Sequence, residues 1–158
     1  GSIRVYAAKK GTYKISKNVQ MQMRKEKQFL NDKNFKKFKK NVVTSKMNLF
    51  NIIKKIKDKN QSIYGVGAPS RASTLINYLG LDQDIIDCVL EIDGSYKIGN
   101  YIPGTQIPII NENILNKKQP DYLILFSWHI KDELKKSLRK KGFKGKFIVP
   151  LPKPKIEK

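Results

Sequence analysis

With 158 residues, 39% of them hydrophobic, the chain can bury one ordinary core, and its single cysteine and single histidine exclude an internal disulfide and a structural zinc cluster. No apolar run is long enough to span a membrane and no hydrophobic signal segment is found, so we expect a cytoplasmic protein without a membrane partner. The net charge of +20 raises the hypothesis of nucleic-acid binding, but lysine supplies 29 of the 33 basic residues, whereas phosphate recognition favours the forked guanidinium of arginine.

The first 60 residues are strongly basic, with 18 Lys and Arg against 3 Asp and Glu. Within residues 1–24, the β-rich segment SIRVYAAKKGTYKI with its glycine at Gly11 predicts a strand or hairpin that leads into the domain. In residues 25–60 apolar side chains recur at intervals of three, four or seven, which predicts a long amphipathic helix or helix pair with lysines on the other face. These apolar positions are Phe35, Phe38, Val42, Leu49, Ile53 and Ile56. A solvated helix face explains the lysines better than a nucleic-acid surface.

After Asn60 short apolar runs alternate with helical segments, and the charge reverses to 4 basic against 7 acidic residues over 61–130. The expected strands are SIYGV, IIDCVLEID, IPGTQIPII, YLILFSW and KFIVPLP, and the expected helices are SRASTLINYLG, NENILNKK and HIKDELKKSLRKKG. This alternation predicts a Rossmann-like three-layer αβα fold with a mostly parallel sheet over residues 61–152, followed by a basic tail at 153–158. Cys88 lies in an apolar run, so we expect a buried, inert thiol.

Three segments follow strands of the predicted sheet: GAPSRAS, DGSYKIGNYIPGT and SWHI. In open α/β sheets, ligands bind outside the carboxyl ends of the strands. Right-handed crossovers place all three segments along that edge, so they should line one crevice.

The first of these segments resembles a dinucleotide fingerprint, G-x-G-x-x-G, but Ser70 stands where the third glycine is expected after Gly65 and Gly67. The following helix would still direct free N–H groups at an anion, with hydroxyls at Ser70 and Ser73 and a cation at Arg71. The alternative is that the glycines only form a tight turn between strand and helix.

The other two segments offer further polar and aromatic groups. Asp93 or Glu91, at the end of the next strand, could hold ribose hydroxyls as in nicotinamide-binding sheets. The long loop that follows is typical of a functional segment, and it contains Lys97. Trp128 and His129 could supply a stacking face and a titratable donor, although a purely structural tryptophan is equally consistent with the pattern.

Taken in order, the segments GVGAPSRASTLINYLGL, EIDGSYKIGNYIPGTQIPI, PDYLILFSWHIKDEL and GKFIVPLP resemble the C-terminal domain of the SAM-dependent sugar C-methyltransferases. The resemblance spans about residues 62–152. It departs from the family at Arg71, Ala72 and Ser73, where lysine, glycine and asparagine are usual. Charge is retained at Arg71, but the hydrogen bonds made there would differ.

The resemblance implies an enzyme of three parts, in which a zinc-binding N-terminal region and a central SAM-binding domain precede this domain. A nucleotide-linked keto-sugar would lie between the central and C-terminal domains, and a base would remove a proton so that the resulting enolate attacks the SAM methyl group. The family's tyrosine, glutamate and histidine motif, its zinc cysteines and a separate SAM glycine motif are absent from this sequence. We therefore expect no catalytic residue, metal or cofactor in this chain, with SAM and zinc held by the upstream domains of the same parent chain.

The leading hypothesis is a domain that binds the diphosphate of a nucleotide-diphosphate sugar and does not methylate alone. The expected substrate-binding residues are Gly65, Gly67, Ala68, Ser70, Arg71, Ser73, Asp93, Lys97, Thr105, Trp128 and His129. The alternative is an NAD-binding or nucleotide-sugar-sensing Rossmann domain, supported by Glu91 and Asp93. The third hypothesis is a basic protein that binds nucleic acid.

Overall fold

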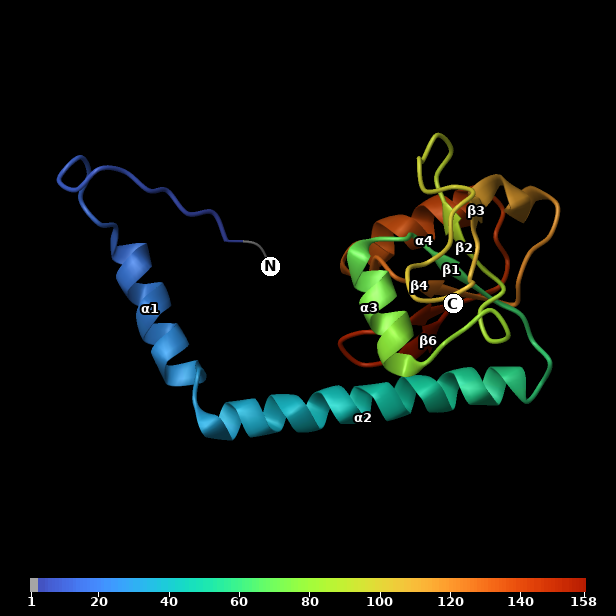
Figure 1. Cartoon of the computed structure of the whole chain (residues 1–158), viewed down its shortest axis with the longest axis horizontal. Coiled ribbons are helices and arrows are strands. Elements are labelled where there is room, and N and C mark those ends of the chain that lie inside the picture. The colour runs from blue at the N-terminus through green and yellow to red at the C-terminus, as the bar shows by residue number, and fades with distance from the viewer. Residues whose placement is uncertain (1–2) are drawn as a thin grey trace. The chain divides into compact units, whose positions relative to one another are not determined.

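The computed structural model describes residues 3–158 (Figure 1). They divide into two compact units, with the boundary between Asn41 and Val42. The first unit holds α1 (Lys17–Phe29) and the start of α2 (Asp32–Lys57). The second unit holds the rest of α2, a six-stranded sheet, two further α-helices and two short 3₁₀ helices. No helix within the described residues combines the length and the apolar character needed to cross a membrane.

The prediction of a strand or hairpin within residues 1–24 is wrong for residues 3–24, the part of this range that the structure describes. Residues 3–16 form no strand, Gly11 belongs to a turn in which the Thr12 N–H donates to the Lys9 carbonyl at 3.1 Å, and α1 begins at Lys17. Every residue from 3 to 33 is exposed, so no neighbouring strand or core satisfies the β-forming side chains that suggested a sheet.

The basic segment forms two helices, because Asn31 interrupts it. The Asn31 side-chain oxygen accepts the Asn34 N–H at 3.0 Å, which caps the start of α2. Along α2 the predicted stripe divides: Leu49, Ile53 and Ile56 are buried in the core of the second unit, whereas Phe35 and Phe38 are exposed.

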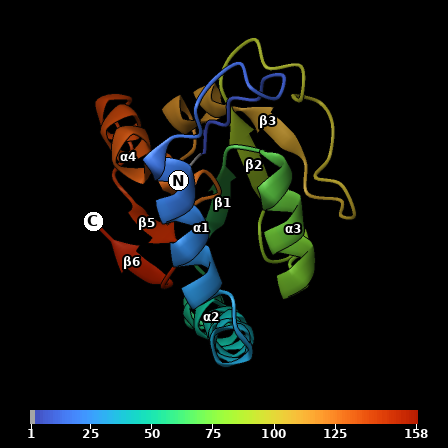
Figure 2. The ribbon, with the colours of Figure 1, turned by 90° about the vertical axis from the view of Figure 1, so that its left-hand side faces the viewer.

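The sheet runs in the order β3-β2-β1-β4-β5-β6. Its strands are β1 (Ile63–Val66), β2 (Cys88–Glu91), β3 (Ile109–Asn111), β4 (Tyr122–Leu125), β5 (Lys146–Val149) and β6 (Lys155–Glu157). All neighbouring pairs are parallel except β5 and β6. Helix α3 (Ser70–Leu79) covers one face and α4 (Lys131–Lys140) the other, as Figure 2 shows. The predicted Rossmann-like αβα architecture with a mostly parallel sheet is confirmed.

The predicted basic tail at 153–158 contains a strand instead, since β6 pairs antiparallel with β5. Glu157 explains the difference: its carboxylate contacts the ammonium groups of Lys135, Lys155 and Lys131 at 2.7, 2.6 and 3.3 Å. The hydrogen bonds from Lys135 and Lys155, with a smaller one from Lys131, lower the pKa of the Glu157 carboxyl to about 2. Lysines that look like a solvated tail in the sequence therefore surround a mostly buried acid.

The core consists of two clusters, one on each face of the sheet. Leu49, Ile53 and Ile56 of α2 join α3 and one face of the strands, while Leu138 of α4 joins the opposite face. Cys88 belongs to the second cluster, and burial raises the pKa of its thiol to about 12, with a smaller contribution from the charge of Asp87. The expected burial of this thiol is confirmed.

The strand order determines where the loops meet. From β1 the chain proceeds outward through β2 to β3, and then returns to place β4 on the other side of β1. The connections that follow β1 and β4 therefore diverge to opposite faces of the sheet. In open α/β sheets, this switch point is where a crevice opens at the carboxyl ends of the strands.

Candidate functional site

The turn between β1 and α3 lies at this switch point and needs a glycine at Gly67. Its φ is +79°, and a Cβ placed there would lie 3.0 Å from the Ser127 hydroxyl, which follows β4. The Gly67 N–H donates to the Leu90 carbonyl of β2 at 2.8 Å. The Leu90 carbonyl and the Ser127 hydroxyl, from the ends of two neighbouring strands, thus approach Gly67. A side chain at this position would strain the turn and crowd Ser127.

The second predicted segment is fixed to this turn by Ala68, Glu91 and Lys97. The Ala68 N–H donates to Glu91 Oε1 at 2.6 Å, and the Lys97 ammonium donates to the Ala68 carbonyl at 2.9 Å. Lys97 also lies 3.5 Å from Glu91 Oε1, and the two side chains are 32% and 13% exposed. The charges of Lys97 and Glu91 therefore largely offset each other, and both polar groups of the Ala68 backbone are already bonded.

The third segment meets α3 through Arg71. Its guanidinium lies 5.6 Å from the centre of the Trp128 ring, and one guanidinium nitrogen lies 3.2 Å from His129 Nδ1. A guanidinium only donates, so His129 Nδ1 accepts and the neutral ring carries its proton on Nε2. Arg71 is exposed and forms no ion pair within residues 3–158. It is the positive charge at this edge that is open to an anion.

The start of α3 adds backbone donors beside Arg71. Pro69 stands at the N-cap position, and no side chain caps the helix. The Ala72 N–H donates to the Pro69 carbonyl at 2.7 Å, whereas the N–H groups of exposed Ser70 and Arg71 have no intrahelical partner. Together with the positive end of the helix, they are suited to an anion such as a phosphate.

Several predicted residues do not join the group of side chains around Arg71. Gly65 is buried in β1, where a Cβ would meet the side chains of Phe126 and Val89, so its role is in packing. Ser73 lies one turn further along α3 and is half-buried. Asp93 is exposed, and its carboxylate accepts a hydrogen bond at 2.6 Å from the Asn111 amide at the end of β3.

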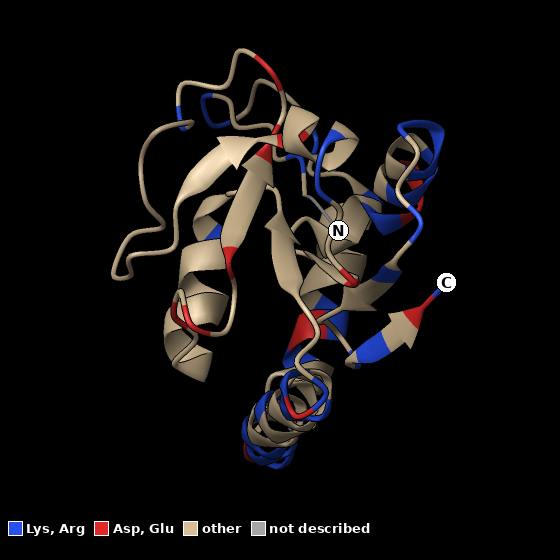
Figure 3. Cartoon of the chain, turned by 90° about the vertical axis from the view of Figure 1, so that its right-hand side faces the viewer, with Lys and Arg blue, Asp and Glu red and all other residues tan. Residues whose placement is uncertain are grey.

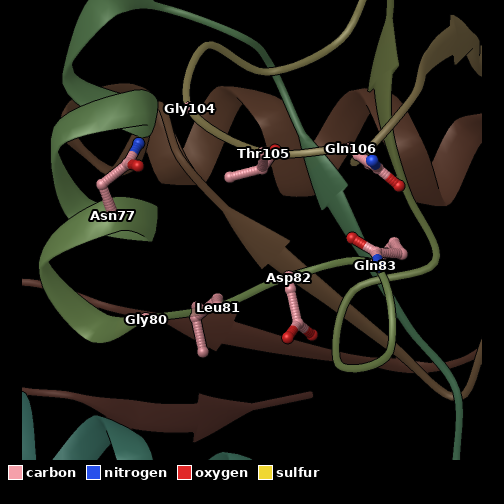
Figure 4. Close-up of a pocket in the computed structure, with 8 residues that line it drawn as sticks. All are labelled: Asn77, Gly80, Leu81, Asp82, Gln83, Gly104, Thr105 and Gln106. Atoms are coloured by element: carbon pink, nitrogen blue, oxygen red, sulfur yellow. The ribbon is translucent and has the colours of Figure 1, made fainter.

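Thr105 belongs to a different region, beside the later turns of α3. Its hydroxyl donates to the Ile102 carbonyl at 2.9 Å and accepts the Ile107 N–H at 3.1 Å, so it stabilises its own turn. Figure 4 shows the open pocket there, of about 590 Å³. Its lining residues are Asn77, Gly80, Leu81, Asp82, Gln83, Gly104, Thr105 and Gln106.

The pocket and the switch point are separate. Asn77 is seven residues beyond Ser70, which corresponds to roughly 10 Å along the helix axis. The Asn77 amide donates to the Pro103 carbonyl at 2.9 Å and ties the loop to α3. The structure therefore brings together Gly67, Ala68, Arg71, Lys97, Trp128 and His129, with Ser70 beside them, and leaves Gly65, Ser73, Asp93 and Thr105 outside.

Sequence reasoning missed what Glu91 does. An acid at the end of the second strand is typical of ribose binding, and nothing in the spacing distinguishes that role from a bond to the glycine turn. The Ser127 contact with Gly67 was also missed, because it depends on how closely β4 approaches the turn. No group of three His, Cys, Asp or Glu side chains suited to a metal ion occurs in residues 3–158.

Comparison with known proteins identifies the family of the chain. Residues 1–152 match the family described as the C-methyltransferase C-terminal domain. The chain belongs to this family. It is 33% identical over 100 residues to the C-methyltransferase NovU of Streptomyces niveus, a match that covers 61% of this chain and 23% of NovU. The match spans less than a quarter of this relative's length, and β6 lies beyond the residues that match the family.

Proposed function

We propose that this C-methyltransferase C-terminal domain binds the diphosphate of a nucleotide-linked sugar at the start of α3 and holds it for methylation by other parts of the enzyme. The observation that carries the proposal is Arg71: an exposed guanidinium beside an uncapped helix start, at the switch point of a parallel sheet. A planar guanidinium can bind phosphate oxygens in pairs, and the neighbouring N–H groups add donors without a competing charge.

The contacts of Ala68 restrict where such an anion would bind. Its N–H already donates to Glu91, whose charge would repel a phosphate placed directly over it. The diphosphate would therefore contact the N–H groups of Ser70 and Arg71 and the Arg71 guanidinium. Lys97 offsets the charge of Glu91, which keeps this edge from being acidic.

The same contacts count against a nicotinamide cofactor. In that hypothesis Glu91 holds ribose hydroxyls, but its side chain is only 13% exposed and bonded to Ala68 and Lys97. A ribose would have to displace these bonds, at the cost of unpairing a mostly buried carboxylate.

The charge distribution counts against a nucleic-acid surface at the site. Figure 3 shows Lys and Arg gathered on α2 and α4, while the loops at the strand ends carry both signs. Residues 61–130, which contain every candidate site residue, carry 4 basic and 7 acidic residues. A polyanion would be attracted to the helices rather than to the switch point.

In this proposal the chemical step belongs to the remainder of the enzyme. NovU is named a C-methyltransferase, and this chain matches only 23% of it. We propose that SAM, the catalytic base and a zinc-binding region lie in the part that has no counterpart here. The residues of this chain would bind and orient the substrate.

Calorimetry tests the proposal with a panel of nucleoside-diphosphate sugars, SAM and NAD, titrated into the whole chain. We expect binding of a nucleoside-diphosphate sugar, and weaker binding by Arg71→Gln. Lys140→Gln is the matched control, because it removes one exposed positive charge at the far end of α4. Binding of SAM but of no nucleotide sugar, or equal losses in the two variants, would refute the proposal.

A further inference from the structure

The loop after β2 carries the most exposed large hydrophobic side chain of the described residues, Tyr96, which is 88% exposed. In Figure 1 this loop projects beyond the ends of the strands, and Ile92 at its base is also exposed. Tyr96 directly precedes Lys97, whose ammonium bonds to the Ala68 carbonyl in the turn before α3. The centre of this exposed ring lies 6.0 Å from the same ammonium, so Tyr96 adjoins a residue that is bonded to the turn before the proposed phosphate site.

The backbone of this loop is braced around Tyr96. The Asn100 amide donates to the carbonyls of Tyr96 and Lys97 at 3.3 and 3.2 Å, and the Gly99 N–H donates to the Ile109 carbonyl at 3.0 Å. Lys97 ties the opposite side of the loop to Ala68 and Glu91. These bonds restrict the position of the tyrosine, so stacking of a ligand on its ring would cost little conformational entropy in the loop.

Trp128, a second aromatic residue at this edge, already has partners. Its ring packs against the core cluster on the α4 face and has the Arg71 guanidinium 5.6 Å from its centre. A ligand ring would have to displace Arg71 to stack there. The Tyr96 ring is open by comparison, since the Lys97 ammonium lies 6.0 Å from its centre, near the outer limit of a cation–π contact.

We propose that Tyr96 is the stacking surface for the nucleobase of the ligand whose diphosphate lies at Arg71. This inference rests on the proposed function and assigns its base-binding residue. Stacking on an aromatic ring tolerates any base and contributes about 5- to 150-fold in affinity, so Tyr96 would strengthen nucleotide binding without selecting one base. Selection among bases would then come from hydrogen bonds made elsewhere.

Calorimetry on the whole chain tests the inference with three probes: uridine diphosphate, thymidine diphosphate and inorganic pyrophosphate. Tyr96→Ala should weaken binding of both nucleotides by about 5- to 150-fold and leave pyrophosphate binding unchanged. Tyr96→Phe should bind like the wild type, because the ring is retained. Tyr101→Ala is the control, since Tyr101 is an exposed tyrosine of the same loop.

The outcomes separate the two proposals. Nucleotide binding that is unchanged in Tyr96→Ala, or a loss shared equally with pyrophosphate or with Tyr101→Ala, overturns the stacking role and leaves the phosphate site standing. If the wild-type chain binds none of the three probes, the proposed function fails and the stacking role fails with it.

Discussion

Gly65→Ala tests whether this glycine serves packing rather than ligand binding. An added Cβ would lie 2.5 Å from Phe126 Cε2 and 2.8 Å from Val89 Cγ2, whereas carbon atoms prefer about 3.5–4.0 Å. The buried Phe126 ring would have to move by about 1 Å within a filled core. Such overpacking costs about 1–3 kcal/mol, and the loss of glycine's freedom in the unfolded chain returns about 0.4–1 kcal/mol, so we expect a net loss of about 1–2 kcal/mol.

Urea unfolding followed by the fluorescence of Trp128, the single tryptophan, measures this loss. A second background, Phe126→Leu, removes ring atoms that the new methyl group would meet. Gly65→Ala should therefore cost less there than in the wild type, as a double-mutant cycle would reveal. An unchanged urea midpoint for Gly65→Ala, or the same cost in both backgrounds, would refute the packing role.

Glu157→Gln should destabilise the protein near neutral pH, because the ionised carboxylate is held in a lysine cluster. The pKa of the Glu157 carboxyl falls from 4.5 to about 2 on folding, so the stabilisation is present above about pH 4.5 and is lost as the pH falls toward 2. A difference in urea midpoint between wild type and variant that does not change with pH would contradict this prediction. Cys88 should react with thiol reagents at pH 8 far more slowly in the native protein than in urea, and equal rates would contradict its burial and raised pKa. Glu91→Gln should raise pyrophosphate affinity by about 2- to 5-fold in calorimetry, because it removes a negative charge beside the site; weaker binding would place the anion elsewhere.

Much of the fold could be predicted from the sequence. The apolar run around Gly65 and the helix that ends at Gly80 appear as β1 and α3, and the burial of Leu49, Ile53 and Ile56 follows from their spacing on α2. These features depend on residues a few positions apart, which local periodicity encodes. The N-terminal segment could not be predicted in this way, because β-forming residues without a neighbouring strand or core do not form a sheet.

The candidate site was predicted at the level of its three loops and only partly at the level of its residues. Motif order and strand alternation place Gly67, Arg71 and Lys97 at one edge, since parallel strands end on the same side of a sheet. No pattern in the sequence indicates that Gly65 faces the Phe126 ring. Nor does any pattern indicate that the loop residue Thr105 lies beside the C-terminal end of α3.

The sequence by itself determined the alternation of strands and helices, the family and the set of loops that meet. Only the tertiary structure decided which partner each polar group takes: Glu91 bonds to Ala68 across 23 residues, Arg71 to His129 across 58, and Glu157 to lysines of α4. The physical reason is that a hydrogen bond requires two groups within about 3 Å. Residues far apart in the chain reach that distance only when the packing of strands and helices brings them together.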